Sequence, residues 1–251
     1  MTTKGKVNVT GVPDPNLWHF PVEGSRGLLN QLYCQNIVAT IRIVDLPDGA
    51  TLDKDALRVI GAKCNLPLFH AIALRVQPGC TVLLFATGKV VISGGKSIQD
   101  MNCGSLTAVS ILNNMLIGNF HVEKRVITNI VGTAYLPPGH TLDFDAIISV
   151  IPLQCMVAFL FAGMFVHMPA HHTNFILFRS GAIVVRSNCI DNMTKGILNL
   201  EEILLRCNAV RVAPGVTSVL SQALWQYNAA QAQAQAQAHS RARTSSLSAA
   251  L

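Results

Sequence analysis

The pentapeptide Asn36-Ile-Val-Ala-Thr40 occurs a second time as Asn129-Ile-Val-Gly-Thr133, 93 residues further along the chain. Two more pairs of similar segments follow in the same order, namely residues 46–53 with 136–143 and residues 84–88 with 177–181. All three pairs keep nearly the same spacing, so the gaps between the two copies are small. The sequence therefore predicts one duplicated domain and not the short period of a solenoid.

The duplication divides the chain into four parts. Residues 34–118 form the first predicted repeat and residues 119–212 the second. Residues 1–33 are rich in proline and are predicted to be an irregular N-terminal extension. Residues 213–251 contain an Ala-Gln alternation and a Ser/Ala/Arg-rich end, which predicts a disordered low-complexity tail. A helical start to this tail is the alternative, because alanine and glutamine favour helices.

Each repeat is predicted to contain four strands and two helices, separated by turn residues. In the first repeat, the strands are residues 36–43, 69–76, 80–86 and 89–93, and the helices are residues 53–62 and 97–116. Successive strands joined by two or three residues pair antiparallel. The sequence therefore predicts an α+β fold built on antiparallel sheet.

Side chains alternate between the two faces of these strands. One face is aliphatic throughout, as in Ile37, Ala39 and Ile41, and belongs under the helices. The opposite face, called the mixed face below, consists of Asn36, Val38, Thr40, Phe69, Ala71, Ala73, Arg75, Thr81, Leu83, Phe85, Lys89, Val91 and Ser93 in the first repeat. Two helices cover only one face of a sheet, and the mixed face is too apolar for ordinary surface. It fits the DNA minor groove, and packing against another protein or a second sheet is the alternative.

The composition excludes a disordered protein, because hydrophobic residues make up 50% of the chain and charged residues only 13%. The net charge of +6 permits a nucleic-acid or anionic-membrane partner without requiring one. The seven cysteines include no CxxC pair, which favours free thiols in a reducing compartment over disulfides.

Enzyme, metal and membrane functions are each considered and rejected. Gly95-Lys96-Ser97 is similar to the end of a P-loop, but Val90 stands where the first glycine is required. The histidines at 167, 171 and 172 have no cysteine or carboxylate nearby in sequence to complete a metal site. The apolar stretch 147–168 is long enough to span a bilayer, but the repeat assigns it to the second sheet. We therefore expect no catalysis, no metal, no cofactor and no membrane partner.

Taken together, the motifs resemble the TATA-box-binding protein family across both repeats. The family's opening motif of Asn, Ile or Met, Val, a small residue and Ser or Thr occurs at residues 36–40 and 129–133. Its strand-turn-strand motif occurs as Leu83-Leu-Phe-Ala-Thr-Gly-Lys-Val-Val-Ile-Ser-Gly-Gly-Lys-Ser97, with residues 161–167 and 175–181 as the second copies. The resemblance implies a pseudo-twofold saddle of two repeats, each a curved antiparallel sheet with two helices on the convex face.

The resemblance also assigns roles to individual side chains. Asn36 and Asn129 would lie at the pseudo-twofold axis and donate to the minor-groove acceptors of A·T pairs. The resemblance implies that two phenylalanine pairs, Phe69 with Phe85 and Phe161 with Phe178, act as wedges that unstack base steps, as in other members of this family. The other implied DNA-binding residues are Val38, Thr40, Arg75, Leu83, Lys89, Val91, Ser93, Lys96, Val131, Thr133, Ile176, Arg179, Val184 and Arg186.

The second repeat departs from the family pattern at its cationic positions. Ala182 replaces a lysine, Cys189 stands at a second lysine position, and His167 stands where arginine is usual. Arg186 falls where threonine is usual. The resemblance therefore implies a weaker phosphate grip in this half, with Arg179 and Arg186 compensating.

These features lead to two hypotheses of function. In the first, the protein is a transcription initiation factor that grips and kinks the minor groove of A·T-rich promoter DNA and nucleates preinitiation complex assembly. Its partners would be double-stranded DNA, other initiation factors and the RNA polymerase machinery, in the nucleus or in a cytoplasmic viral factory. In the second, the same fold is a protein-interaction module with weak or no DNA binding. Steep salt dependence of DNA binding would separate them, because neutralising phosphates releases counterions.

Overall fold

A computed structural model describes residues 17–44, 63–64, 71–77, 79–85, 89–116, 119–151, 155–160, 162–216 and 219–248. The predicted short helix at 53–62, Phe69 and Phe161 lie outside these residues. The four strands predicted for the first repeat are present as β2 (Gln31–Val44), β4 (Ala71–Val76), β5 (Cys80–Phe85) and β6 (Lys89–Gly95). The long helix predicted at residues 97–116 is confirmed by α2 (Ile98–Leu116).

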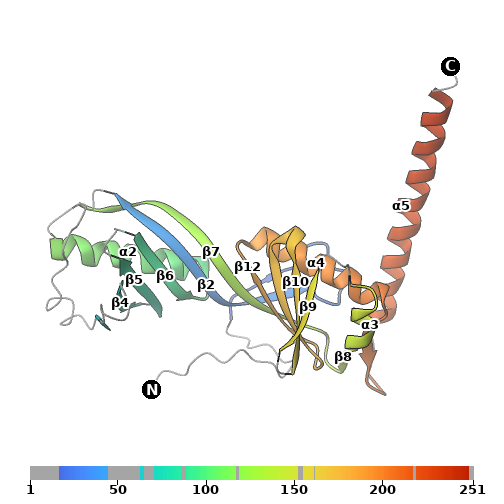
Figure 1. Ribbon diagram of the computed structural model, residues 1–251, viewed down its shortest axis with the longest axis horizontal. Helices are drawn as coiled ribbons and strands as arrows, with labels where there is room; N and C mark the ends of the chain where they lie inside the picture. The colour runs from blue at the N-terminus through green and yellow to red at the C-terminus, as the bar shows by residue number, and fades with distance from the viewer. Residues whose placement is uncertain are drawn as a thin grey trace.

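One antiparallel sheet dominates the fold (Figure 1). Its strands run in the order β3-β4-β5-β6-β2-β7-β12-β11-β10-β9, and β1 pairs with β2 beside this path. The strand bounds are β1 His19–Pro21, β2 Gln31–Val44, β3 Lys63–Cys64, β4 Ala71–Val76, β5 Cys80–Phe85, β6 Lys89–Gly95, β7 His121–Tyr135, β9 Met156–Leu160, β10 Gly163–Met168, β11 Thr173–Phe178 and β12 Ala182–Ser187. A separate two-stranded sheet pairs β8 (His140–Leu142) with β13 (Val210–Val212).

In the part of the chain that the structure describes, four α-helices and one 3-10 helix accompany the sheet. Their bounds are α2 Ile98–Leu116, α3 Phe144–Ile148, η1 Pro169–His171, α4 Ile190–Arg206 and α5 Leu220–Ser248. Helix α2 packs on β5, β6 and β2, whereas α4 packs on β11 and β12 (Figure 1). Each half of the sheet therefore carries one long helix.

The register between β2 and β7 is two-fold symmetric. Asn36 pairs with Val131, Ile37 with Ile130, and Val38 with Asn129. Because the same 93-residue spacing relates Asn36 to Asn129 and Val38 to Val131, a pseudo-twofold axis passes through the Ile37–Ile130 pair. The strand order is mirrored about this pair, with β6 and β5 on one side and β12 and β11 on the other.

Burial confirms the assignment of the two strand faces. The aliphatic residues Ile37, Ala39 and Ile41 are buried under the helices, and so are their counterparts in β4, β5 and β6. The mixed-face residues of β2, β5 and β6 are half-buried or exposed. Ala71 is the exception in β4, because it is buried opposite Phe85. The mixed face is therefore the open side of the sheet.

Part of the segment that was predicted to be irregular is ordered against the second repeat. Strand β1 and the buried Leu28 and Leu29 lie within it, and β2 begins at Gln31. The carboxylate of Glu201 in α4, fully buried, accepts hydrogen bonds from Ser25 Oγ at 2.8 Å and from the N–H groups of Arg26, Leu28 and Leu29 at 2.8, 2.9 and 3.1 Å. Prolines favour irregular chain, but a buried carboxylate imposes a fixed loop because it requires donors.

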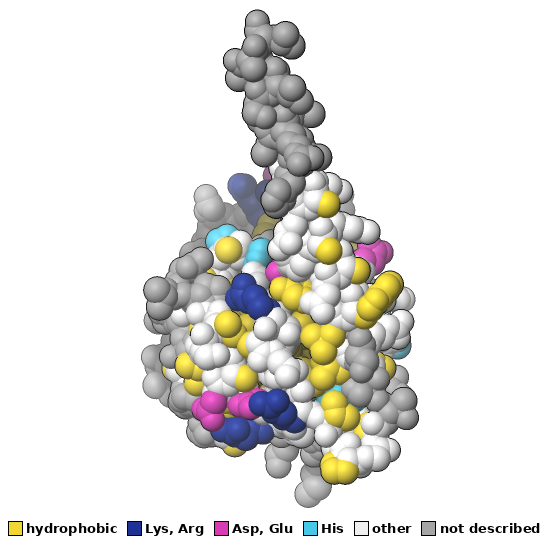
Figure 2. All heavy atoms as spheres, turned by 90° about the vertical axis from the view of Figure 1, so that its right-hand side faces the viewer, with side chains coloured by type: hydrophobic (Ala, Val, Ile, Leu, Met, Phe, Trp, Pro, Cys, Tyr) yellow, Lys and Arg dark blue, Asp and Glu magenta, His cyan; other side chains and the backbone are white. Residues whose placement is uncertain are grey.

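The tail adopts the helical alternative and not the predicted disorder, because α5 extends through the Ala-Gln alternation and projects from the body (Figure 1). Ala223, Leu224 and Tyr227 of its first turns pack on the core, and the Arg26 guanidinium lies 5.3 Å from the Tyr227 ring centroid. This docking nucleates a segment whose alanines and glutamines then propagate the helix. Figure 2 shows hydrophobic side chains gathered where the helix meets the body. Trp225 of α5 is 70% exposed.

No helix in the described part of the chain combines the length and apolar composition needed to cross a membrane. The apolar stretch 147–168 contains instead the end of α3 and the strands β9 and β10.

Helix α3 begins at a charged cap whose contribution to stability depends on pH. Asp143 accepts hydrogen bonds from the N–H groups of Asp145 and Ala146, and its Oδ2 lies 2.6 Å from Arg211 Nη2. The hydrogen bond from Arg211, followed by the bond from Ala146, lowers the pKa of Asp143 below its ordinary value of 3.8. A lowered carboxyl pKa in the folded state gives stability above the unfolded pKa, and this stability is lost as the pH falls through the folded pKa.

We therefore expect Asp143→Asn to lower Tm, with a deficit that is constant above about pH 5 and shrinks below about pH 4. Asparagine keeps an oxygen for the cap, so the change isolates the charge. Thermal unfolding of both proteins between about pH 2 and pH 7 checks this. A deficit that is the same at every pH would contradict it.

Candidate nucleic-acid interface

Asn36 and Asn129 lie on the mixed face on either side of the pseudo-twofold axis. The N–H of Gly94 donates to Asn36 Oδ1 at 2.9 Å, and Arg186 Nε donates to Asn129 Oδ1 at 2.5 Å. Gly94 has a φ of +91°, a backbone conformation that a side chain would strain. With both carbonyl oxygens engaged, each carboxamide keeps its NH₂ group as a donor. The centre of the face therefore presents two amide donors.

A row of side chains crosses each half of the mixed face from this centre. In the first half, Val38 pairs with Ser93, Ser93 with Thr81, and Thr81 with Arg75. The equivalent row in the second half is Val131, Arg186, Asn174 and His167. His167 Nδ1 lies 2.7 Å from Asn174 Oδ1. The two rows occupy matched positions, but one carries hydroxyls where the other carries a guanidinium and an amide.

An apolar strip runs beside each row. Leu83 and Val91 pair across β5 and β6, and Ile176 and Val184 pair across β11 and β12; all four are half-buried. Phe165 continues the strip opposite Ile176. Phe165 is absent from the residues predicted to contact DNA, although strand alternation places Phe165 and His167 on the same face. These strips provide the apolar surface expected of the mixed face.

Thr133 was predicted to contact DNA together with Thr40, but Thr133 is fully buried, whereas Thr40 is half-buried. The reason is the early start of β2, which places Tyr33 opposite Thr133 and brings Gln35 Nε2 to 3.0 Å from the Thr133 hydroxyl. The Tyr33 ring also lies 5.8 Å from the Tyr135 ring. In this structure the surface at this place belongs to Tyr33, not to Thr133.

Phe85 and Phe178 end the equivalent strands β5 and β11, and both are half-buried. Gly163, opposite Phe178 in the sheet, has no side chain, and a Cβ there would lie 2.7 Å from Ile176 Cγ2 and 3.3 Å from Phe178 Cε1. Gly163 thus leaves room for the Phe178 ring. The two partner phenylalanines of the predicted wedges, Phe69 and Phe161, fall outside the described residues.

The predicted phosphate-binding cations divide into two groups. Arg75, Lys89 and Lys96 are exposed in the first half. Both arginines expected to compensate in the second half contact the protein itself, since Arg186 bonds to Asn129 and the Arg179 guanidinium lies 4.5 Å from the Phe144 ring centroid. The first half is therefore the one with unengaged cations at the predicted positions.

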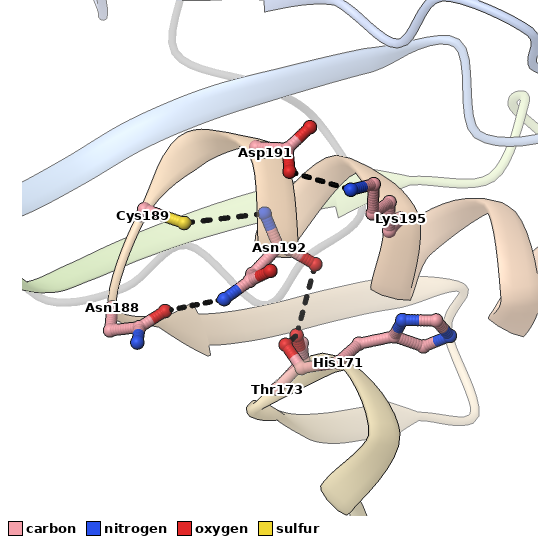
Figure 3. A network of polar contacts seen from close by, with 7 residues as sticks. All are labelled: His171, Thr173, Asn188, Cys189, Asp191, Asn192 and Lys195. Atoms are coloured by element: carbon pink, nitrogen blue, oxygen red, sulfur yellow. Dashed lines mark hydrogen bonds and ion pairs between the residues drawn. The ribbon is translucent and has the colours of Figure 1, made fainter.

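The turn from β12 into α4 shows the same inequality (Figure 3). Cys189, at the position of Lys96, caps α4 by accepting from the Asn192 N–H at 3.4 Å. Asn188 Oδ1 accepts from Asn192 Nδ2 at 2.8 Å, and the Thr173 hydroxyl donates to the Asn192 carbonyl at 3.1 Å. Both turns are held by internal hydrogen bonds, since in the first half the Lys96 N–H donates to Asp100 Oδ2 at 2.8 Å. The difference is that the first half presents the exposed side chain of Lys96 at this position, whereas the second half has the capping Cys189.

Across the described ranges, no group of three or more His, Cys, Asp or Glu side chains is arranged to hold a metal ion. His167 contacts Asn174, and His171 Nε2 lies 3.1 Å from Asn199 Nδ2. Burial raises the pKa of the Cys34 thiol to about 12, so this cysteine stays protonated at neutral pH.

Comparisons with known proteins agree with this geometry. The family model described as "Transcription factor TFIID (or TATA-binding protein, TBP)" matches residues 31–115. The chain is 30% identical over 164 residues to "TATA-box-binding protein 2" of Haloferax volcanii, covering 63% of this chain and 84% of that protein. It is 35% identical over 112 residues to the "TATA-box-binding protein" of Schizosaccharomyces pombe, but that match covers 44% of this chain and only 46% of that protein.

Among solved structures, "Methanococcus jannaschii TBP" matches with a TM-score of 0.56 and 18% sequence identity, over 70% of this chain and 98% of that chain. This likeness shows the fold, a mixed α+β structure with a large antiparallel sheet. The sequence match to the Haloferax volcanii protein extends over most of a relative and shows the family. The chain belongs to the TATA-box-binding protein family, which consists of DNA-binding transcription factors and not of enzymes.

Proposed function

We propose that this protein is a transcription initiation factor whose mixed face grips and kinks the minor groove of A·T-rich promoter DNA. The observation that carries the proposal is the symmetric register at Ile37 and Ile130, which sets two asparagines and two apolar strips about one axis. The proposed shape is a pseudo-twofold saddle whose halves are curved sheets with helices on the convex side.

The chemistry of the face suits the floor of a minor groove. A·T pairs offer only acceptors there, and the amide NH₂ groups of Asn36 and Asn129 are donors. The half-buried Leu83, Val91, Ile176 and Val184 match the apolar edges of sugars and bases. Phe85 and Phe178 lie at equivalent strand ends, where side chains that insert between base steps would kink the duplex.

The proposal extends to partners and place. The bent DNA complex would nucleate a preinitiation complex with other initiation factors and an RNA polymerase, in the nucleus or in a cytoplasmic viral factory. The second candidate, a protein-interaction module, is favoured by one observation: Cys189, which caps α4, stands at the position of the exposed Lys96, so the second half has fewer cations available for phosphates. The two candidates differ in their salt dependence, because only phosphate neutralisation releases counterions.

The test is equilibrium binding to a short A·T-rich duplex and to a G·C-rich control, across a salt series. We expect preference for A·T and a steep loss of affinity with salt. The double variant Phe85→Ala/Phe178→Ala should bind the A·T duplex roughly 100- to 10,000-fold more weakly, because each ring loses about 1.5–3 kcal/mol of apolar burial. Absence of salt-sensitive binding to either duplex would favour the interaction module.

A further inference from the structure

The polar row of the mixed face is unequal in its two halves at the position next to the axis. Arg186 is exposed and pairs with Val131, whereas its counterpart Ser93 is half-buried and pairs with Val38. The Arg186 Nε–H donates to Asn129 Oδ1, whereas the equivalent Asn36 accepts from the backbone N–H of Gly94. The centre of the face thus carries a positive charge on one side of the axis, and a hydroxyl on the other.

We propose that Arg186 and Asn129 form one reading unit, which makes the DNA half-site under the second repeat stricter for A·T pairs than the half-site under the first. This inference rests on the proposed function. The protein would then recognise an asymmetric A·T-rich site in one preferred orientation.

The chemistry of the minor groove supports this assignment. Because Nε is used on Asn129, the guanidinium keeps its terminal N–H groups as donors, and the Asn129 NH₂ adds two more. Such a cluster of donors matches A N3 and T O2 but opposes the N2 amino group that guanine adds to the groove. The charge also favours the narrow groove of A·T tracts, where the potential is more negative. Ser93 has a hydroxyl that both donates and accepts, so it discriminates less.

The inequality can be measured with three duplexes of one design: a palindromic all-A·T parent, an asymmetric duplex with a single central pair on one side changed to G·C, and a palindromic duplex with both symmetric pairs changed. The wild-type protein can orient its tolerant half over a single G·C pair. We therefore expect the first change to weaken binding little, and the second to weaken it by a further factor of about ten or more.

Two variants isolate the guanidinium. Arg186→Ser copies the side chain of the first half, so the first and the second G·C substitution should weaken DNA binding by equal factors. The swap Ser93→Arg/Arg186→Ser moves the charge to the first half, at the position that pairs with Val38. The two G·C substitutions should then weaken binding by unequal factors again. Residue 186 is exposed, so the fold of Arg186→Ser should be retained, which thermal unfolding checks.

Equal penalties in the wild-type protein overturn the inference while leaving DNA binding intact. Unequal penalties that persist in Arg186→Ser also overturn it. Failure to bind even the A·T parent duplex would overturn the proposed function together with this inference. Binding to the parent duplex therefore separates this outcome from those that overturn the inference alone.

Discussion

Replacement of Glu201 by alanine is expected to lower the free energy of unfolding by about 3–5 kcal/mol, because four hydrogen-bond donors lose the carboxylate that accepts from them. The Glu201 side chain is fully buried and accepts hydrogen bonds from the Ser25 hydroxyl and from the backbone N–H groups of Arg26, Leu28 and Leu29, at 2.8–3.1 Å. Alanine would leave these four donors without their acceptor, and each buried donor left unsatisfied costs about 1–3 kcal/mol. Entry of water would recover part of the sum.

Urea unfolding measures this change, and the chain supplies a matched control in Glu202→Ala, one residue along the same helix. Glu202 is half-buried and should lose well under 1 kcal/mol, roughly as surface substitutions do. Glu201→Gln keeps one acceptor oxygen and should fall between the two. Equal losses for Glu201→Ala and Glu202→Ala would show that the N-terminal loop is not held by this carboxylate.

Replacement of Leu83 by glutamate is expected to abolish DNA binding, with a loss of roughly 100-fold or more in affinity. Leu83 lies in the apolar strip of the first half, paired with Val91 in β6 and Ala73 in β4. A carboxylate there would be buried against the acceptors of the groove without a partner, which costs about 3–5 kcal/mol. The same side chain is half-exposed in the free protein, so the fold should tolerate the charge.

The control for this variant is Leu106→Glu, the same chemical change at a residue of α2 that is 67% exposed. It should bind the A·T duplex within about twofold of the wild type, since it lies on the helix side of the sheet. Fluorescence anisotropy gives both affinities, and thermal unfolding confirms that both variants are folded. Similar losses for the two variants would remove the mixed face from the interface.

Alternation and duplication were sufficient to predict the four strands of the first repeat and, except at Ala71, their two faces. The buried Ile37 and Ile41 and the half-buried Val38 follow from the two-residue period of a strand, and the repeat predicts the same pattern in β7 and β12. The pairing of Asn36 with Val131 is the arrangement expected of two related copies about an axis. Local periodicity carries this information because it depends only on neighbours in sequence.

Contacts between distant segments could not be predicted in this way. Thr133 lies on the predicted face, but Gln35, 98 residues away, donates to its hydroxyl and covers it. The Arg186–Asn129 contact depends on the register between β12 and β7, which the residue types do not encode. The burial of Glu201 has no signal in the sequence, because its partners Ser25 to Leu29 lie in a segment whose prolines indicated irregular chain.

The tail illustrates a different limit. Composition alone groups alternating alanine and glutamine with low-complexity disorder, although both residues favour helices. Tertiary packing decided the outcome, because Ala223, Leu224 and Tyr227 dock the first turns of α5 before the alternation begins. A hydrophobic i, i+1, i+4 cluster next to a low-complexity run is the signal that could have predicted the helix.

The central claim is that the mixed face reads the minor groove, and inosine·cytosine base pairs test it most directly. An I·C pair presents the minor-groove pattern of A·T, because inosine lacks the N2 amino group, and the major-groove pattern of G·C. Affinities for three duplexes of one design, with A·T, I·C or G·C pairs in the site, therefore separate the grooves. We predict that the I·C duplex binds like the A·T duplex, and that the G·C duplex binds far more weakly. An I·C duplex that binds like the G·C duplex would contradict the account.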